Sequence, residues 1–255
     1  MALRGYAAGH LPLGNGYETM IFVSWCLSLL ALGIGRRFPI SAASGLLMSG
    51  FALLVASLGM ANPQITPLVP VLRSPWLSLH VSLIMVSYAL LGLLMLNGTA
   101  ALALAAAARA GTAERTSRTL ARLRLFGRLL LYPAVFLLTA GIFTGAVWAN
   151  ASWGRYWGWD PKEVWALITL IVYALPLHEQ SLARFRRPLF FHAYTLWAFA
   201  AVLMTYFGVN YLLGGMHSYG GGFRPGYAAA TVFAAVTAFA LLTVAALIRQ
   251  RRMDT

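Results

Sequence analysis

LSLHVSLIMVSYALLGLLMLNGTAALALAAAA, residues 77–108, contains no Asp, Glu, Lys or Arg. About 20 apolar residues suffice to cross the hydrocarbon core of a bilayer as an α-helix, so this run predicts a membrane span that is tilted or projects beyond the bilayer. Further apolar runs lie on both sides of it, at about 18–35, 40–59, 129–149, 163–178, 189–213 and 227–248. The sequence therefore predicts an all-α, polytopic transmembrane helix bundle of about seven spans.

Composition supports a membrane protein and excludes several other classes. Of the 255 residues, 60% are hydrophobic and 10% are charged, and the mean hydropathy is +0.73, whereas soluble domains carry about 25% charged residues. A disordered chain, a nucleic-acid-binding domain and a disulfide-rich module are excluded. The single cysteine, Cys26, rules out an intrachain disulfide and a cysteine-based metal centre. Residues 1–255 are predicted to form a single integral membrane domain.

Arginine positions predict the orientation. With the N-terminus outside, the inner segments hold 14 of the 19 basic residues and the outer segments hold five. Because inner loops carry the excess of Lys and Arg, this orientation is favoured. The net charge of +13 is then a topological signal with some attraction to anionic membrane lipid, and it indicates no nucleic-acid partner.

Three predicted outer segments carry unusual residues. In the first, Pro75 suits a helix start, which puts Trp76 and His80 four residues apart on one helix face. The second, residues 148–165, holds five tryptophans separated by glycines. The third, residues 208–220, is rich in glycine and contains His217.

The tryptophan-rich segment suits a large, flat, apolar ligand with polar edges, and haem fits that description. Indole rings stack on flat aromatic systems, and glycine permits close approach to the backbone. Tryptophans also collect at membrane interfaces, which accounts for one or two of the five. Asp160 and Glu163 either place charge beside the ligand or cap the next helix.

Histidines offer ligands for a haem iron. His80 and His217 both fall at the predicted outer face, whereas His178 lies about 22 Å along a helix from Glu163, near the inner boundary. One haem cannot contact both His178 and the outer pair. Either there are two haem positions or His178 is structural. His192, at a similar depth, and His10 in the N-terminal tail are not assigned as ligands.

The run WGRYWGWDPKE at residues 153–163 resembles the tryptophan-rich WWD signature of haem-handling proteins in cytochrome c maturation. Its continuation to Trp165, with the GVN run at 208–210 and GMHSYG at 215–220, is similar to the CcsA/ResC family, the System II cytochrome c synthase component. The resemblance covers roughly residues 70–225.

The resemblance implies haem b as the bound substrate, with His80 and His217 as outer iron ligands and His178 as the ligand of an inner site. It also implies a set of residues in contact with the haem: Trp76, Trp153, Gly154, Tyr156, Trp157, Trp159, Asp160, Lys162 and Glu163. The implied reaction attaches haem to a Cys-x-x-Cys-His segment of apocytochrome c, as part of a holocytochrome c synthase (haem lyase) complex. The implied partners are a ResB-like membrane subunit, apocytochrome c and thiol-reducing maturation proteins. The expected location is a bacterial plasma membrane, or alternatively a thylakoid, with the WWD loop outside.

Other functions stay open at this point. A CcmC-like haem-export protein of System I is the nearest alternative, and a non-haem transporter and a di-haem electron-transfer subunit are the others. Members of the resembled family often have a further N-terminal span, so an eighth span is a second possibility. The sequence contains no ResB-like domain, so we expect this chain to need a partner to act as a synthase.

Overall fold

The computed structural model describes residues 1–57, 63–65, 73–213, 215 and 226–254, and this part of the chain is helical without strands. The α-helices are α1 (Ala2–Ala8), α2 (Gly16–Ile34), α3 (Pro39–Ser57), α4 (Pro75–Ala107), α5 (Ala113–Trp153), α6 (Pro161–Ala174), α7 (Pro188–Leu203), α8 (Val209–Leu212) and α9 (Gly226–Asp254). Short 3₁₀ segments are η2 (Ala110–Thr112), η3 (Leu175–His178) and η4 (Ala183–Arg186), and η5 (Met204–Gly208) is a π-helix.

The predicted polytopic helical fold is confirmed. Within the described residues, six helical segments are long and apolar enough to cross a membrane, and they correspond to six of the seven predicted spans. The fourth begins earlier than predicted, because α5 starts at Ala113. Its first turns are arginine-rich, yet they contain good helix formers and a Glu114–Arg118 ion pair one turn apart at 3.0 Å.

The remaining predicted span, 163–178, is divided between two helix types. Helix α6 has 14 residues and η3 adds four. At about 1.5 Å per α-helical residue and about 2.0 Å per 3₁₀ residue, the two together measure about 29 Å. That length is close to the ~30 Å hydrocarbon core, so the segment is long enough to cross only if η3 is included.

The chain divides into two compact units, and both long helices, α4 and α5, contribute to each. Unit 1 comprises Met1–Leu93 and Leu130–Trp159, and unit 2 comprises Leu94–Leu129 and Asp160–Thr255. The prediction of a single membrane domain stays a prediction.

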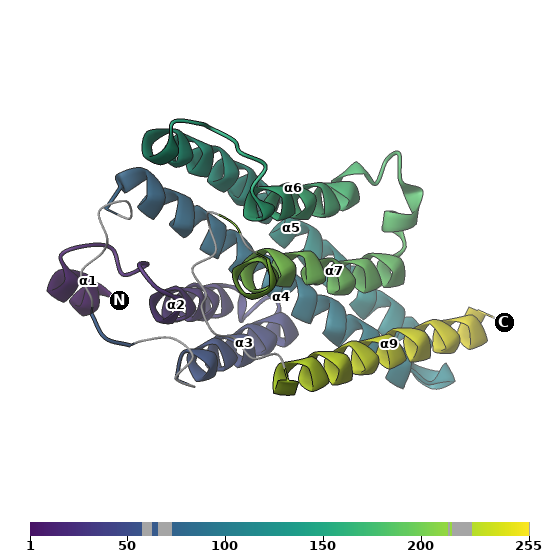
Figure 1. Ribbon diagram of the computed structural model, residues 1–255. Helices are drawn as coiled ribbons and strands as arrows, with labels where there is room; N and C mark the ends of the chain where they lie inside the picture. The colour runs from purple at the N-terminus through teal and green to yellow at the C-terminus, as the bar shows by residue number, and fades with distance from the viewer. Residues whose placement is uncertain (58–62, 66–72, 214, 216–225, 255) are drawn as a thin grey trace. The chain divides into compact units, whose positions relative to one another are not determined.

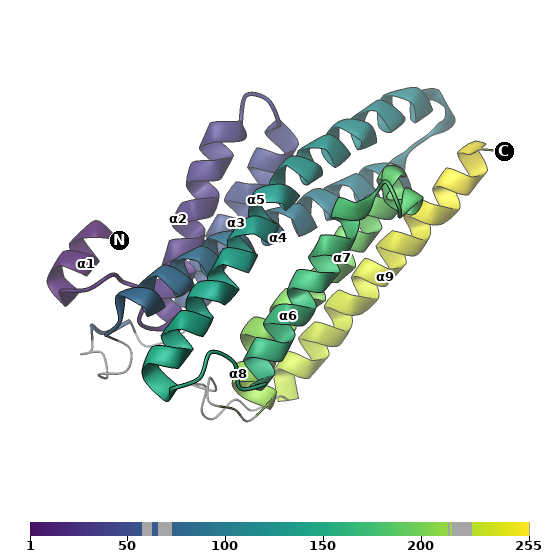
Figure 2. The same cartoon turned by 90° about the horizontal axis from the view of Figure 1, so that it is seen from above.

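In unit 1, α2 and α3 form a hairpin whose helices lie side by side (Figures 1 and 2). Their interface is made of small residues and buried hydroxyls: Ser49 Oγ lies 2.8 Å from the Oγ atoms of both Ser24 and Ser28. Hydroxyl pairs of this kind join membrane helices where apolar side chains gain little by leaving lipid. In the same unit, Ser87 of α4 donates to the carbonyl of Ala134 in α5.

In unit 2, α6 and α7 lie side by side, and α9 runs along α7 (Figure 2). The α6–α7 contact includes a buried pair of hydroxyls, Thr169 and Thr205, at 2.9 Å. An apolar cluster joins α4, α7 and α9 through Leu102, Leu196 and Ala246. These contacts also place α6 beside η5 and α8, where the glycine-rich residues 208–220 begin.

Candidate functional site

His80 lies in the second turn of α4 and is hydrogen-bonded to α5. Its Nδ1 atom is 2.6 Å from the carbonyl oxygen of Gly141. A carbonyl only accepts, so Nδ1 carries the proton, and in the neutral ring Nε2 has the lone pair that can bind a metal. Metal-binding histidines usually donate their other ring nitrogen to a carbonyl or carboxylate in this way.

Two glycines of α5 form the surface against which α4 packs. A Cβ added at Gly145 would lie 2.6 Å from Nδ1 and 2.7 Å from Cε1 of His80, and one added at Gly141 would lie 2.6 Å from Cδ1 of Ile84. These distances are shorter than any van der Waals contact. The G-x-x-x-G spacing therefore allows the imidazole to lie directly on the α5 backbone, as such motifs do between membrane helices.

Trp76 precedes His80 by one helical turn. The helix begins at Pro75, as the sequence predicts, so both residues belong to α4. The Trp76 side chain is 47% exposed, whereas His80 is half-buried. An exposed indole and an oriented imidazole thus occupy successive turns of the same helix.

The tryptophan-rich segment begins inside α5. Trp148 is buried, and its ring meets that of Trp153 edge to face at a centroid distance of 4.8 Å. The helix ends at Gly154, whose φ of +73° lies in the left-handed region that glycine adopts without strain. A Cβ at Gly154 would meet nothing within 4 Å, so the surface beside it is open.

The turn that follows presents aromatic side chains outward. Tyr156 is 60% exposed and Trp159 is 71% exposed, and the Trp157 and Trp159 rings meet at 89° with centroids 5.8 Å apart. Trp159 has a φ of +58°, which costs a bulky residue of order 1 kcal/mol or more. Strained backbone together with exposed aromatic surface is typical of a ligand-binding segment.

Asp160 and Glu163 form the N-terminal cap of α6. The Asp160 carboxylate accepts from the Lys162 backbone N–H at 3.0 Å, and the Glu163 carboxylate accepts from the Asp160 N–H at 3.1 Å. Together they make a reciprocal capping box, followed by Pro161 at the first helical position. The capping interpretation is confirmed for both carboxylates, and contact with haem stays a prediction.

Lys162 connects the two sequence signatures. Its Nζ donates to Oδ1 of Asn210 at 2.8 Å, and the Asn210 amide donates to the Tyr206 carbonyl at 2.6 Å. Burial lowers the pKa of Lys162 to about 8, with the Asp160 charge opposing the shift. A Cβ at Gly215 would lie 2.5 Å from Oδ2 of Asp160, so this glycine also sits directly on the cap.

The π-helix η5 ends two positions before Asn210. Single π turns insert an extra residue into a helix and recur at functional sites. Here η5 separates α7 from α8, the short helix that contains Asn210.

His178 ends η3 and is exposed. Its Nδ1 lies 3.0 Å from the carbonyl oxygen of Ala174, so the tautomer is the same as that of His80. The next residue, Glu179, is held by two arginines of α5: Arg124 donates to Oε2, and Arg128 Nη1 lies 2.6 Å from Oε1. This ion cluster attaches the segment after His178 to α5 within unit 2.

The structure thus joins His80 to α5, and Lys162 to the segment after α7. His217 lies outside the described residues. His192 is buried, with Nε2 3.3 Å from the Leu120 carbonyl oxygen, which suits the structural role expected of it. Gly141 and Gly145 were not predicted as site residues, although their G-x-x-x-G spacing inside a predicted span is a recognisable signal.

Comparison with known proteins agrees with these features. Residues 13–217 match the family model described as cytochrome c assembly protein. The chain is 42% identical over 222 residues to protein NrfI of Wolinella succinogenes, which covers 87% of this chain and 24% of that protein. It is 36% identical to the cytochrome c biogenesis protein CcsA of Chlamydomonas reinhardtii (86% of this chain, 64% of that protein) and of Synechococcus sp. strain WH7803 (86% and 80%).

The chain therefore spans about a quarter of NrfI and less than two thirds of the Chlamydomonas protein. The family match covers most of the chain, including both signatures up to His217. Together with the apolar helices, the match shows a multi-pass membrane protein, and this chain belongs to the cytochrome c assembly protein family.

Proposed function

We propose that this chain carries haem to the outer face of the membrane and holds it between His80 and His217, against the WWD segment. With a ResB-like partner it then presents haem for thioether attachment to the Cys-x-x-Cys-His segment of apocytochrome c. The observation that carries this proposal is the His80 ring, which is held on the α5 backbone with Nδ1 donating to Gly141. That arrangement fixes the tautomer that an iron ligand needs.

Other residues have separable roles in this proposal. The exposed Trp76, Tyr156 and Trp159 provide apolar surface for the porphyrin plane. Haem also carries two propionates, and the Lys162 ammonium is a suitable partner for one of them. His178 would ligate haem at an inner site, earlier on the route, with its Nδ1 already satisfied by Ala174.

The proposed chemistry requires little from the protein beyond positioning. Each substrate thiol adds its sulfur and its hydrogen across one haem vinyl group, so a C–S and a C–H bond form with no leaving group. The thiols belong to apocytochrome c, which agrees with the single cysteine of this chain. Holding haem with its vinyl edge toward the peptide converts a bimolecular encounter into an oriented one. The histidine of the Cys-x-x-Cys-His segment can then replace one of the two protein ligands on the iron, which would release the product from the site.

The first test is the absorption spectrum of the protein purified with its ResB-like partner. We expect a bis-histidine haem spectrum in the parent, and loss of haem or changed ligation in the His80→Ala/His217→Ala variant. His10→Ala is the matched control, because His10 also donates Nδ1 to a backbone carbonyl, that of Leu11, and is not assigned to iron. An unchanged spectrum in the double variant would refute the outer site.

Adding an apocytochrome peptide then separates the proposed synthase from its rivals. A synthase transfers haem to the peptide as a covalent thioether adduct, which survives acid extraction. Haem that passes only to a chaperone indicates a CcmC-like exporter. Haem that stays in place indicates an electron-transfer subunit, and a parent free of haem indicates a transporter.

A further inference from the structure

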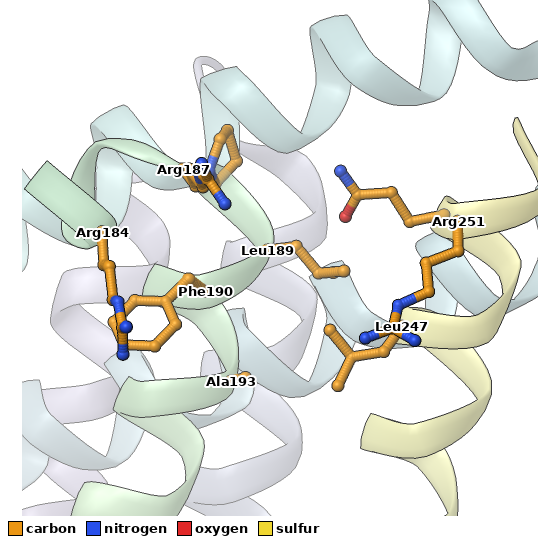
Figure 3. Close-up of a pocket in the computed structure, with 9 residues that line it drawn as sticks. Arg184, Arg187, Leu189, Phe190, Ala193, Leu247 and Arg251 are labelled. Carbon is orange, nitrogen blue, oxygen red and sulfur yellow. The ribbon is translucent and has the colours of Figure 1, made fainter. Parts of the chain in front are cut away.

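A pocket of about 940 Å³ lies between the start of α7 and the end of α9, within unit 2 (Figure 3). Its volume falls in the range of about 300–1,000 Å³ found for ligand sites. The walls are apolar and include Leu189, Phe190 and Leu247, and three arginines line the same pocket: Arg184, Arg187 and Arg251. Figure 3 shows Arg184 and Arg187 on one side of it and Arg251 on the other.

The three arginines are available to a ligand. In the described part of the chain, no hydrogen bond or ion pair holds their guanidinium groups, and all three are exposed. Neighbouring arginines differ: Arg124 binds Glu179, and Arg249 donates to the carbonyl of Ala108. Between residues 164 and 253 the sequence has one acidic residue, Glu179, and two arginines already hold it. With Asp254 at the end of α9 included, residues 164–254 hold seven arginines and two acidic residues, so this part of the chain keeps an excess of positive charge.

The pocket lies at the ends of two membrane-crossing helices. The candidate spans are Pro188–Gly208 and Val232–Arg251, so the apolar walls belong to the spans and the arginines lie at their termini. This is the depth at which phosphate headgroups meet acyl chains. Guanidinium groups bind phosphate oxygens in a bidentate manner, and basic pockets between membrane helices suit anionic lipid headgroups.

We propose that this pocket is a binding site for an anionic phospholipid. The phosphate contacts Arg184, Arg187 and Arg251, and an acyl chain lies against Leu189, Phe190 and Leu247. Haem is a poorer occupant, because none of the nine lining residues is a histidine, methionine, cysteine, tyrosine or lysine able to ligate iron. The site is independent of His80 and of the proposed haem chemistry.

The test measures lipid binding to the full chain in detergent by native mass spectrometry, with phosphatidylglycerol and phosphatidylcholine as probes. Each arginine near the headgroup contributes about five-fold in affinity, so the Arg184→Gln/Arg187→Gln/Arg251→Gln variant should bind phosphatidylglycerol on the order of a hundredfold more weakly. The control is Arg109→Gln/Arg115→Gln/Arg122→Gln, which removes the same charge from exposed arginines that do not line the pocket. It should bind phosphatidylglycerol like the parent.

Several outcomes would overturn the proposal. The first is equal binding of phosphatidylglycerol and phosphatidylcholine by the parent. The second is an equal loss of phosphatidylglycerol binding in both triple variants. The third is that millimolar inorganic phosphate displaces bound phosphatidylglycerol as effectively as added phosphatidylglycerol does. Loss of haem from the pocket variant with lipid binding unchanged would also contradict it. Arg187→Lys keeps the charge without the planar guanidinium, so a partial loss in this folded variant supports bidentate phosphate contact even if the triple variant misfolds.

Discussion

At the scale of single residues, Gly145 determines where the His80 imidazole can lie. The ring rests on the α5 backbone at a distance that leaves no room for a methyl group. Any side chain at residue 145 must displace the ring or separate α4 from α5, and either change weakens the hydrogen bond from Nδ1 to Gly141. Gly145 is thus a positioning residue for His80, the proposed iron ligand.

Gly145→Ala should therefore alter haem ligation while His80 is still present. We expect a shifted or weakened bis-histidine spectrum, together with a loss of about 1–3 kcal/mol in stability from overpacking. Gly50→Ala in α3 is the matched control, because a Cβ there would meet nothing within 4 Å; it should keep the parent spectrum and gain about 0.5–1 kcal/mol in helix stability. A Gly145→Ala spectrum identical to the parent's would show that the close packing does not orient the ligand.

Lys162 is the one lysine of the chain, and its titration is accessible to experiment. Burial lowers its pKa from 10.5 to about 8 in the folded protein. Between these two values the unfolded chain keeps a proton that the folded chain has released. Raising the pH through this window therefore favours the folded state, and below about pH 8 Lys162 makes no further contribution to the pH dependence.

We predict that the thermal unfolding midpoint of the parent rises relative to that of Lys162→Met as the pH goes from 8 to 10. The comparison removes the tyrosine and cysteine titrations that both proteins share. Parallel pH profiles for the two proteins would mean that burial does not lower the pKa of Lys162. In the haem-loaded complex, retention should fall over the same pH range if the ammonium binds a propionate.

At the scale of elements, Asp160 at the start of α6 has two candidate roles: it caps the helix, and it is predicted to contact haem. One pair of substitutions separates these roles. Asp160→Ala removes the cap and should destabilise the first turn of α6 by about 1 kcal/mol. Because the turn then opens more often, hydrogen exchange of the Lys162 and Glu163 amides should become about five-fold faster. Asp160→Asn keeps a capping oxygen and should preserve slow exchange. If Asp160 also contacts haem through its charge, Asp160→Asn should weaken haem retention while hydrogen exchange at the start of α6 stays slow. Equal exchange in all three proteins would mean that the capping box is dispensable.

The elements also show what the sequence could and could not predict. Apolar runs located the spans because a bilayer selects for about 20 apolar residues whatever the packing. The start of α5 was missed, because hydropathy does not detect an arginine-rich helix that continues beyond the apolar run. The partners of His80 and Lys162 were missed for another reason: both contacts join residues far apart in the chain, 61 positions for His80–Gly141 and 48 for Lys162–Asn210. Motif residues were recognisable locally, but their partners depend on how the helices pack.

At the scale of the whole molecule, the number of spans depends on whether α6 and η3 cross the membrane. The apolar runs predict seven spans and the arginine counts favour an outer N-terminus, which together put Tyr156 outside and Gln180 inside. The segment measures about 29 Å with its 3₁₀ turn, which is enough to cross without tilt. If it did not cross, Tyr156 and Gln180 would lie on the same side, and so would the two ends of the chain.

Single cysteines introduced into a Cys26→Ser background can decide between these topologies. Tyr156→Cys, Gln180→Cys and Arg115→Cys all replace exposed side chains. In spheroplasts, we expect a membrane-impermeant maleimide to label Tyr156→Cys at once, and the other two only after permeabilisation. Labelling of both Tyr156→Cys and Gln180→Cys from outside would reduce the bundle to six spans. Labelling of Arg115→Cys and Gln180→Cys from outside, with Tyr156→Cys protected, would invert the seven-span orientation, and with it the face at which His80 and the WWD segment are proposed to hold haem.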